Sequence, residues 1–489
     1  MPSRDLREFI EVLEKHGELV RVSALVDPEL EITEITDRVT KSGGPALLFE
    51  KPKNSNIPLL INTFGTERRM KMALGISDYS EIENRIQKLL KPNIPSSLLE
   101  KLSMLPMLAE LGAVPPKIVK SGPCQEVAET DRVNLFDFPI LKCWPKDGGK
   151  YITFPMVITK DPETGDRNVG TYRIQVYDEK TTAMHWHWHK DGANHFAKHK
   201  KMHKRMEVAI ALGADPITMY AATAPLPPQI DEFLLAGFLR KQPVELVKCK
   251  TIDLEVPAHA EIVLEGYIDP EEVRTEGPFG DHTGFYSAEG PFPVFHVKAI
   301  TRRRDPIYPT IIVGQPVQED YFLGKATERI FLPLVKMQLP EIVDWNFPAE
   351  GVFHNCLLVS IKKSYPAHAR KVANAMWGLG QLMFTRLVVI VDENINVQNV
   401  SEVAFHVFNN TEPERDIFFT EGPVDILDHA SQKLGYGSKM GVDATRKWKE
   451  EGATRGWPDL IEMNMETKEM VTRRWNEYGI EAPHFSRAR

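Results

Sequence analysis

Apolar side chains at helical spacing open the chain, and short apolar runs follow them. Leu6, Phe9, Ile10 and Leu13 recur every three or four positions, which predicts an amphipathic helix that Gly17 ends. Helical and strand patterns then alternate, which predicts an N-terminal α/β unit. The other elements expected in it are strands at 18–22, 45–50 and 58–64 and helices at 32–39 and 98–112.

The middle of the chain is dominated by short runs that are rich in β-branched residues and bounded by turn residues, which is typical of strands. Two helices are expected among them, at 193–212 and 230–241. Many short strands with two helices predict a barrel-like sheet. The strands expected are 152–159, 168–177, 181–189, 217–223, 244–249, 260–268, 294–301 and 310–314.

The pattern changes again in the last third of the chain. A long helix at 321–338 precedes alternating strands and helices, and this alternation predicts an α/β domain with a predominantly parallel sheet. The stretch at 437–445 is interpreted as a loop. The other elements expected are strands at 356–361 and 386–392 and helices at 366–383, 401–410 and 464–478.

The length of 489 residues exceeds what one core usually serves, so two or three domains are expected. Pro115, Pro116 and Pro123 mark the first boundary. The terminal helix carries Met470 and Trp475 on a charged background, which requires a partner surface. The segments expected are an N-terminal α/β domain (1–115), a sheet-rich domain (116–316), a linker helix (317–347), a C-terminal α/β domain that mediates self-association (348–440), and a loop with a tail helix (441–489).

Composition places the chain among ordinary soluble globular proteins. It is 42% hydrophobic and 26% charged, and its formal net charge of -8 argues against nucleic-acid binding. Its four cysteines are far apart without a CxxC pair, so a reducing cytoplasm is expected rather than a zinc ribbon or a disulfide framework. The charged N-terminus predicts no signal peptide, and no run is long enough for a membrane span.

Residues 168–192 combine an amide, an arginine and closely spaced histidines. Two alternating runs around a polar turn at 178–180 predict a hairpin. On its second strand His185, His187 and His189 would share one face, because side chains two apart point the same way. Such a face would suit a transition metal, and a half-buried strand with polar residues outside is the alternative.

Asn168 and Arg173 lie an odd number of residues apart, so a regular strand would place them on opposite faces. A bulge or bend at Gly170 would bring both towards one pocket. Further along, Glu276 and Asp281 flank a Gly-Pro-Phe-Gly turn. Two carboxylates held close to an arginine can separate their roles, one staying ionised and the other delivering a proton. A solvated polar turn is the alternative.

Four blocks of sequence resemble blocks of the UbiD family and occur in the family's order. They are NVGTYRIQV at 168–176, IDEFLLAGFLR at 230–240, EGPFGDHTGFY at 276–286 and GSKMGVDAT at 437–445. The resemblance covers essentially the whole chain. It implies a split β-barrel flavin-binding domain and a decarboxylase that uses prenylated FMN.

The resemblance also implies a metal site. Asn168 and Glu232 match the family's metal-binding residues, and His189 falls where many members carry a histidine near the flavin phosphate. Amide, carboxylate and phosphate oxygens form a hard site that suits Mn²⁺ or Mg²⁺, which would bridge the phosphate to the protein. K⁺ is a further expected ion.

The family's catalytic triad falls on Arg173, Glu276 and Asp281, and some members carry Glu where this chain has Asp281. We expect Arg173 to orient the substrate and hold Glu276 ionised, while burial against Phe279 raises the pKa of Asp281 so that it can protonate the product. His282 is expected beside this site. The flavin contacts that the resemblance implies, besides Asn168, Arg173 and His189, are Thr153, Thr171, Tyr172, His185, Trp186, His187, Lys190 and Asp191.

The implied activity is the non-oxidative decarboxylation of an aromatic acid in the cytoplasm. The segments at 185–193 and 446–452 resemble members of quinone pathways, which implies a dihydroxynaphthoate of the menaquinone route first and a polyprenyl-4-hydroxybenzoate of the ubiquinone route second. A flavin prenyltransferase would supply the cofactor, a polyprenylated substrate would bring peripheral membrane contact, and a homo-oligomer (dimer or hexamer) is expected. Two alternatives are a metal-dependent hydrolase built on the histidine strand and a non-catalytic flavin-binding protein.

Overall fold

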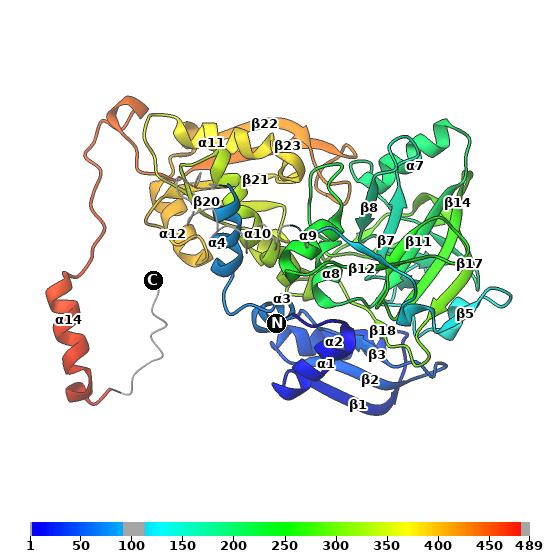
Figure 1. The fold of residues 1–489 in the computed structure, drawn as a ribbon. Coiled ribbons are helices and arrows are strands. Elements are labelled where there is room, and N and C mark those ends of the chain that lie inside the picture. Colours follow the sequence, from blue (N-terminus) through cyan, green and yellow to red (C-terminus); the bar gives the residue numbers. More distant parts are fainter. Residues whose placement is uncertain (1, 91–111, 113, 481–489) are drawn as a thin grey trace, which may run out of the picture.

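The computed structural model of the chain describes residues 2–90, 112 and 114–480. An N-terminal α/β unit, a large curled sheet and a C-terminal α/β unit follow one another, and helix α14 (Met465–Arg474) lies apart from all three (Figure 1). This arrangement confirms the predicted mixed α/β class. The helix predicted at 98–112 lies outside the described residues, apart from residue 112, and the predicted domain boundaries stay predictions.

The N-terminal sheet takes its last strand from a distant part of the chain. Strand β18 (Tyr308–Pro309) pairs with β3 (Leu59–Ile61) and so joins this unit to the central sheet. Helix α1 (Leu6–Lys15) starts where the Asp5 carboxylate accepts a hydrogen bond from Glu8 N, and it buries the predicted apolar face. The other elements are β1 (Leu19–Val26), α2 (Glu31–Lys41), β2 (Ala46–Pro52), α3 (Glu67–Leu74) and α4 (Ser80–Leu90).

The central sheet has nine strands, in the order β6-β9-β10-β17-β14-β11-β7-β8 with β5 beside β17. Its longest pair, β14 (Ile262–Glu276) and β17 (Gly290–Arg302), is antiparallel, so the end of β14 delivers Glu276 and the following turn to one end of the sheet. The other strands are β5 (Val127–Glu129), β6 (Lys150–Ile152), β7 (Met156–Lys160), β8 (Arg167–Gly170), β9 (Ile174–Val176), β10 (Thr181–Ala183) and β11 (Met206–Leu212).

Shorter elements accompany the central sheet. Helix α9 (Glu232–Arg240) lies where a helix is predicted, and its first residue is a predicted metal ligand. The remaining elements are α7 (Asp191–Lys201), α8 (Pro216–Ala221), the sheet of β4 (Lys117–Val119), β12 (Glu245–Lys248) and β13 (Glu255–Pro257), and the pair β15 (Phe279–Gly280) and β16 (Tyr286–Ser287).

The C-terminal unit follows the long helix α10 (Glu319–Gln338). Its three central strands are parallel and its two edge strands are antiparallel, as the predicted predominantly parallel sheet requires. The elements are β19 (Ile342–Asn346), β20 (Cys356–Ile361), α11 (His368–Trp377), β21 (Leu387–Asp392), α12 (Val400–Asn410), α13 (Pro413–Asp416), β22 (Ile417–Pro423) and β23 (Tyr436–Asp443). None of the helices in the described ranges is long and apolar enough to cross a bilayer.

Two predicted elements of the central region are wrong because of local capping and turn chemistry. The predicted strand at 217–223 is helix α8, because Asp215 caps it by accepting a hydrogen bond from Thr218 N and Pro216 suits its first turn. The predicted helix at 193–212 is α7 followed by strand β11. The chain reverses between them at His203, whose backbone φ is 52°.

Two further differences concern strands. The predicted strand at 310–314 is not one, and only β18 before it pairs with a sheet. The predicted loop at 437–445 is mostly strand β23, which lies between β21 and β22. Its glycines obscured this in the sequence, and Gly441 is needed there because a Cβ would lie 2.2 Å from the ring of Phe418.

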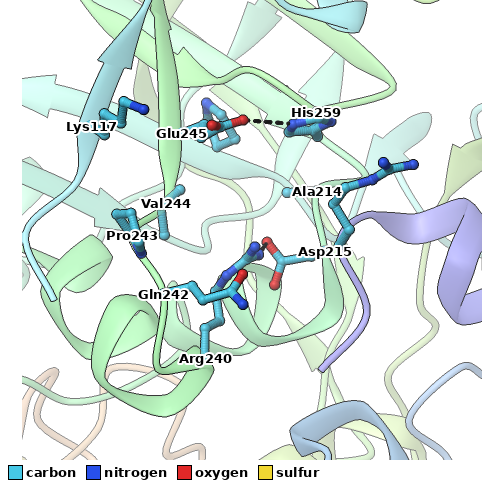
Figure 2. A pocket seen from close by; sticks show the side chains of 11 residues that line it. Lys117, Ala214, Asp215, Arg240, Gln242, Pro243, Val244, Glu245 and His259 are labelled. Atoms are coloured by element: carbon cyan, nitrogen blue, oxygen red, sulfur yellow. Dashed lines mark hydrogen bonds and ion pairs between the residues drawn. The ribbon is translucent and has the colours of Figure 1, made fainter. Parts of the chain in front are cut away.

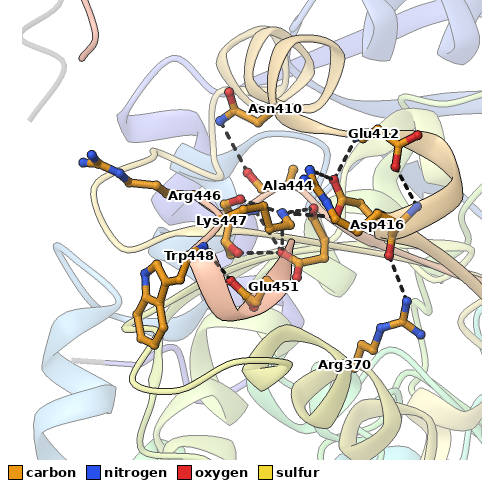
Figure 3. Close-up of polar contacts among 12 residues, drawn as sticks. Arg370, Asn410, Glu412, Asp416, Ala444, Arg446, Lys447, Trp448 and Glu451 are labelled. Atoms are coloured by element: carbon orange, nitrogen blue, oxygen red, sulfur yellow. Dashed lines mark hydrogen bonds and ion pairs between the residues drawn. The ribbon is translucent and has the colours of Figure 1, made fainter. Parts of the chain in front are cut away.

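A buried polar cluster holds the chain after β23. Nζ of Lys447 donates to the carbonyls of Asp443 and Thr445, each at 2.6 Å, and lies 3.1 Å from the Asp443 carboxylate and 3.7 Å from Asp416 (Figure 3). Nearby, Lys363 pairs with Glu451 at 2.5 Å. We call Lys447, Asp443, Asp416 and Thr445 the Lys447 cluster.

Beyond this cluster the chain becomes an exposed arm, residues 452–480. None of its residues is buried in the described structure, and the arm leads to α14, well separated from the body (Figure 1). Apolar side chains on it face solvent, with Ile461 99% exposed and Met465 66% exposed. The arm therefore exposes apolar side chains that no other part of the described chain covers. Such side chains require a partner surface.

Candidate active site

Three charged side chains meet at one end of the central sheet. Nε and Nη2 of Arg173 donate to Oε1 and Oε2 of Glu276 at 2.9 and 3.0 Å, and Nη1 donates to Oδ2 of Asp281. Glu276 ends β14 and Asp281 follows β15, so both acids come from one short turn. The Glu276 side chain is fully buried, and those of Arg173 and Asp281 are 8% and 9% exposed. The structure thus brings the predicted catalytic residues together.

Both carboxyls are held in their ionised forms. Burial opposes the ionisation of Glu276, but hydrogen bonds from His185 and Arg173 outweigh it and lower its pKa. Burial also opposes the ionisation of Asp281, yet the hydrogen bond from His282 and the charge of Arg173 hold its pKa well below the usual range. The expected rise in the pKa of Asp281 is therefore wrong for this arrangement, because Arg173 pairs with both acids rather than with Glu276 alone.

The turn that carries Asp281 is fixed through its backbone. Oδ1 of Asp147 accepts a hydrogen bond from Gly280 N at 2.8 Å, and the Tyr151 hydroxyl donates to the Pro278 carbonyl at 3.1 Å. Burial raises the pKa of Asp147 to about 6, although it accepts several backbone hydrogen bonds. These contacts position the acid without touching its carboxylate.

Trp144 fixes the same turn from its other side. A Cβ on Gly280 would lie 2.2 Å from Cδ1 of Trp144, and a Cβ on Gly314 would lie 2.8 Å from Cζ2 of the same indole. The indole Nε1 donates to the Val313 carbonyl at 2.9 Å. Only glycines permit both backbone segments to approach the ring this closely, so Gly280 is required directly before Asp281.

The histidine stretch does not form the predicted strand. The predicted hairpin exists, since β9 and β10 pair at Val176 and Thr182, but its second strand ends at Ala183. The pleat that would align alternate side chains is therefore absent beyond that point.

His189 consequently separates from the other two histidines, whose rings lie 5.2 Å apart. His185 is buried with Nδ1 2.9 Å from Oε2 of Glu276, whereas His189 is exposed with its ring 5.3 Å from that of Phe384. The shared histidine face is thus a wrong prediction. Within residues 2–90 and 114–480, no three His, Cys, Asp or Glu side chains are grouped to hold a metal, so the hydrolase alternative loses the constellation on which it was built.

Asn168 and Glu232 lie close together at the start of α9. The chain leaves β8 at Gly170, as the predicted bend requires, and Nδ2 of Asn168 lies 3.4 Å from the Tyr172 hydroxyl. Oε2 of Glu232 accepts a hydrogen bond from Val169 N at 2.7 Å.

Glu232 stands in the first turn of α9, where a glutamate is often exposed, but its side chain is buried. It is 7% exposed, and burial raises its pKa to about 8. No basic side chain of the described chain pairs with it. A buried carboxyl without a basic partner, bonded to the backbone residue that follows Asn168, fits a cation brought from outside the chain, whereas His189 makes none of these contacts.

The predicted flavin contacts fall into two groups. Oγ1 of Thr171 and Nε2 of His185 are buried and lack a hydrogen-bond partner among the described residues, so both can serve a ligand's polar atoms. The hydroxyl of Thr153 is already used, because it donates to the Ile311 carbonyl at 2.6 Å. Nζ of Lys190 likewise donates to Oε1 of Gln381 at 2.8 Å.

The other predicted contacts line the same region. The rings of Tyr172 and Trp186 pack edge to face with centroids 6.1 Å apart, and the ring of His187 lies 5.2 Å from that of His185. Asp191 is the first residue of α7. Orphaned donors and a buried carboxyl without a cation are what a phosphate-bearing cofactor with a metal would satisfy.

Groups from the C-terminal unit complete the site, and sequence reasoning missed them. Nδ1 of His282 lies 2.8 Å from Oδ1 of Asp281, and Nε2 of His282 lies 2.8 Å from Nε2 of His354, which precedes β20. Asp320 in the first turn of α10 and Asp425 after β22 act electrostatically on His282. The sequence predicts His282 beside the site, but no local pattern marks His354, Asp320 or Asp425, and His354 lies 72 positions from His282.

A cavity of about 260 Å³ opens elsewhere, and none of the predicted site residues lines it (Figure 2). Two of its acids are paired within the wall, Asp215 with Arg240 and Glu245 with His259. The chemistry expected from the sequence therefore does not belong to this cavity.

Comparison with known proteins gives the family. Three models of 3-octaprenyl-4-hydroxybenzoate carboxy-lyase match: the N-terminal domain at residues 10–89, the Rift-related domain at 117–316 and the C-terminal domain at 321–444. A protein of Aquifex aeolicus (strain VF5) is 55% identical over 481 residues, which cover 98% of this chain and 99% of that protein.

Solved structures of two enzymes are similar over nearly the whole chain. The closed form of the vanillic acid decarboxylase of Sedimentibacter hydroxybenzoicus is 29% identical, with a TM-score of 0.87 over 98% of this chain and 100% of that one, and its open form gives a TM-score of 0.78. An evolved dimeric form of the UbiD-class enzyme HmfF of Pelotomaculum thermopropionicum, in complex with prFMN, is 29% identical with a TM-score of 0.77 over 95% of this chain and 98% of that one. The chain therefore belongs to the UbiD family and is a carboxy-lyase.

Proposed function

We propose that this carboxy-lyase decarboxylates an aromatic carboxylic acid with prenylated FMN as its cofactor. The observation that carries the proposal is the buried Arg173, which bonds two carboxylates on one rigid turn. Similar proteins support it, since one solved relative acts on vanillic acid and another holds prFMN.

The side chains divide the work as follows. The chemistry that prenylated FMN supplies when bound is an electrophile that holds the ring while carbon dioxide leaves. Arg173 orients the substrate carboxylate, and its own pKa is too high for it to serve as the proton source. Asp281, with Glu276 beside it, returns a proton to the ring carbon.

The cofactor would be held by the groups that lack partners in the chain. Thr171 and His185 offer polar atoms. Asn168 and Glu232 would hold Mn²⁺ or Mg²⁺, which would supply positive charge for the flavin phosphate. His189 is a third candidate ligand, and K⁺ a further ion. A flavin prenyltransferase supplies the cofactor.

The substrate we favour is a quinone precursor, a dihydroxynaphthoate of the menaquinone route first and a polyprenyl-4-hydroxybenzoate of the ubiquinone route second. The family models carry the name of the second substrate. A polyprenylated substrate would bring the protein to a membrane surface. We place the activity in the cytoplasm, where four unpaired cysteines fit a reducing environment.

We also propose that the chain self-associates through its arm and its C-terminal unit. The arm exposes Ile461, and α12 of the body exposes Phe408 to 83%. Apolar side chains of this size on both parts favour contact with a second copy. Light scattering at micromolar concentration tests this, and a monomer would contradict it.

The function is tested with protein co-expressed with a flavin prenyltransferase. The absorbance and mass of the released cofactor identify it, and carbon dioxide release is measured across a panel of aromatic acids. We expect prenylated FMN and turnover of at least one hydroxyaryl acid. Bound flavin without carbon dioxide from any acid would instead favour the non-catalytic flavin-binding alternative.

A further inference from the structure

A chain of hydrogen bonds leads away from Asp281 and crosses to the C-terminal unit. Oδ1 of Asp281 is 2.8 Å from Nδ1 of His282, and Nε2 of His282 is 2.8 Å from Nε2 of His354. The opposite oxygen, Oδ2, is bound by Arg173. One oxygen of Asp281 is therefore bound by the permanently charged Arg173, and the other faces the imidazole of His282. Of Arg173 and His282, only His282 can give up a proton at neutral pH.

The two imidazoles are in different electrostatic states. Burial alone would lower the pKa of His282, but its bond to Asp281 raises it above the ordinary value. Burial and the neighbouring His282 lower the pKa of His354 to about 4. His282 is thus the protonated ring and His354 the neutral acceptor, which fits one hydrogen between the two Nε2 atoms.

Other charged groups act electrostatically on this pair. They are Asp281 in the turn, Asp320 on α10, Asp425 after β22 and Lys190 in the histidine stretch, and His187 acts in turn on Asp425. Nδ1 of His354 and Oδ2 of Asp320 are buried without a hydrogen-bond partner in the described part of the chain. Burial raises the pKa of Asp320 to about 7, so its proton is exchangeable near neutral pH.

We propose that His282 and His354 relay the proton that recharges Asp281 in each turnover, and that the relay is complete only when the C-terminal unit packs against the central sheet. His282 and His354 are positioning residues in this scheme, because they act through Asp281. The inference rests on the proposed function, in which Asp281 protonates the product.

The proton balance is simple. The Nδ1–H bond of the His282 imidazolium breaks as an O–H bond forms on Oδ1 of Asp281, leaving a neutral imidazole and a neutral acid. The acid then passes this proton to the ring carbon that has lost carbon dioxide. The neutral ring is left with its hydrogen on Nε2, so exchange with water first breaks that N–H bond and forms one at Nδ1, water taking one proton and returning one. A further proton from water, passed through His354 to the freed Nε2 of His282, then restores the imidazolium. No electron is transferred.

The two histidines give different signatures when replaced in the cofactor-loaded enzyme. His354→Gln keeps the proton stored on His282, so we expect a first turnover at the wild-type rate followed by a steady state about ten- to a hundred-fold slower, within the range of general acid catalysis. His282→Gln removes the stored proton, so the first turnover slows as well. Added imidazole should accelerate the His354→Gln steady state.

Rapid-quench measurement of product, the pH profile of kcat and the solvent isotope effect test this. His429→Gln is the matched control, because its ring packs tilted against that of Phe285, with centroids 4.1 Å apart, without joining the hydrogen-bonded chain. We expect kcat to fall at high pH as His282 loses its proton, and this limb to vanish in His282→Gln. Flavin content is measured in each variant as a readout independent of turnover.

Unchanged kcat and pH profile in both variants would overturn the relay while the wild-type activity still supports the proposed function. Equal slowing of the first and later turnovers in His354→Gln, with flavin retained, would also overturn it, since that is the result of a merely structural role. Absence of decarboxylation by the wild type would instead count against the proposed function.

Discussion

The active site and the Lys447 cluster are both buried groups of cations and carboxylates, but they are assembled differently. Lys447 bonds Asp443 and Thr445, its neighbours in sequence, and two of its three hydrogen-bond acceptors are backbone carbonyls (Figure 3). Arg173 bonds Glu276 and Asp281, which lie 103 and 108 positions away.

The difference shows how a structural cluster can be told from a reactive one. In the Lys447 cluster a local loop satisfies its own charge, and the lysine Nζ has no capacity left for a ligand. Around Arg173, Nε2 of His185 and Oγ1 of Thr171 remain without partners among the described residues. Both clusters bury charged groups. Only the reactive cluster combines polar atoms that lack hydrogen-bond partners with carboxylates brought together from distant parts of the sequence.

The largest expected effect is a loss of activity that follows from a change in the active site and not in the Lys447 cluster. Asp281→Asn should keep flavin and metal but reduce kcat by about a hundred- to ten-thousand-fold, because an amide cannot donate a usable proton. Carbon dioxide release and hydrogen–deuterium exchange at the product's ring carbon, measured side by side, check it. Near wild-type rates in both assays would make Glu276 the next candidate acid.

A change in the Lys447 cluster should instead lower the stability of the fold without affecting activity. Lys447→Met leaves the buried Asp443 carboxylate without its cation, whereas Asp416 keeps Arg415, and removing one partner of a buried pair costs about 3–5 kcal/mol. Thermal unfolding should shift to lower temperature while kcat per folded molecule stays unchanged. Lys449→Met, at an exposed lysine two residues further on, is the control, and equal shifts in both variants would remove the special role of the cluster.

Glu232 sharpens the comparison as a buried carboxylate that depends on a cation from outside. Glu232→Gln should weaken metal binding by at least the ten- to a hundred-fold that loss of a supporting partner costs, and flavin should be lost with it. Metal analysis and flavin absorbance of the purified variant measure both, beside Glu179→Gln in the exposed hairpin turn. Full flavin occupancy in metal-free Glu232→Gln would contradict the proposal.

The smallest effect is shared by both clusters. Interactions lower the pKa of Asp281 and of Asp416 below the ordinary aspartate value, so each contributes stability that is present above about pH 3.9 and lost as the pH falls through the folded pKa. Asp281→Asn and Asp416→Asn should each flatten the acid limb of a melting-temperature profile. An unchanged limb in either variant would show that its carboxyl is not stabilised by folding.

Much of this site could be predicted from the sequence, because its residues lie in blocks that resemble those of the family and follow the same order. Arg173, Glu276 and Asp281 were placed by those blocks, and the structure brings them into contact. The error lay in the electrostatics. Sequence shows that Asp281 is near an arginine and an aromatic, but not that one guanidinium bonds both acids and that His282 holds the other oxygen.

The remaining errors have physical causes of two kinds. Short apolar stretches such as 217–223 fit a strand or a helix equally, and here the Asp215 cap and Pro216 decide for the helix. His354 and Asp425 reach the site through tertiary packing, and nothing in their own sequence neighbourhood records it. The histidine stretch was misjudged because alternation suggested a pleat that the backbone abandons after Ala183.

The indole of Trp144, wedged against Gly280 and Gly314, has a consequence for redesign of the pocket. Any side chain added at either glycine would push the ring, and with it the turn that carries Asp281. A library aimed at bulkier acids would therefore do better to leave these three positions constant and vary residues outside the wedge. Conversely, Trp144→Phe paired with Gly314→Ala is a two-site change that would alter the packing of the turn that carries Asp281 while every reacting group keeps its identity.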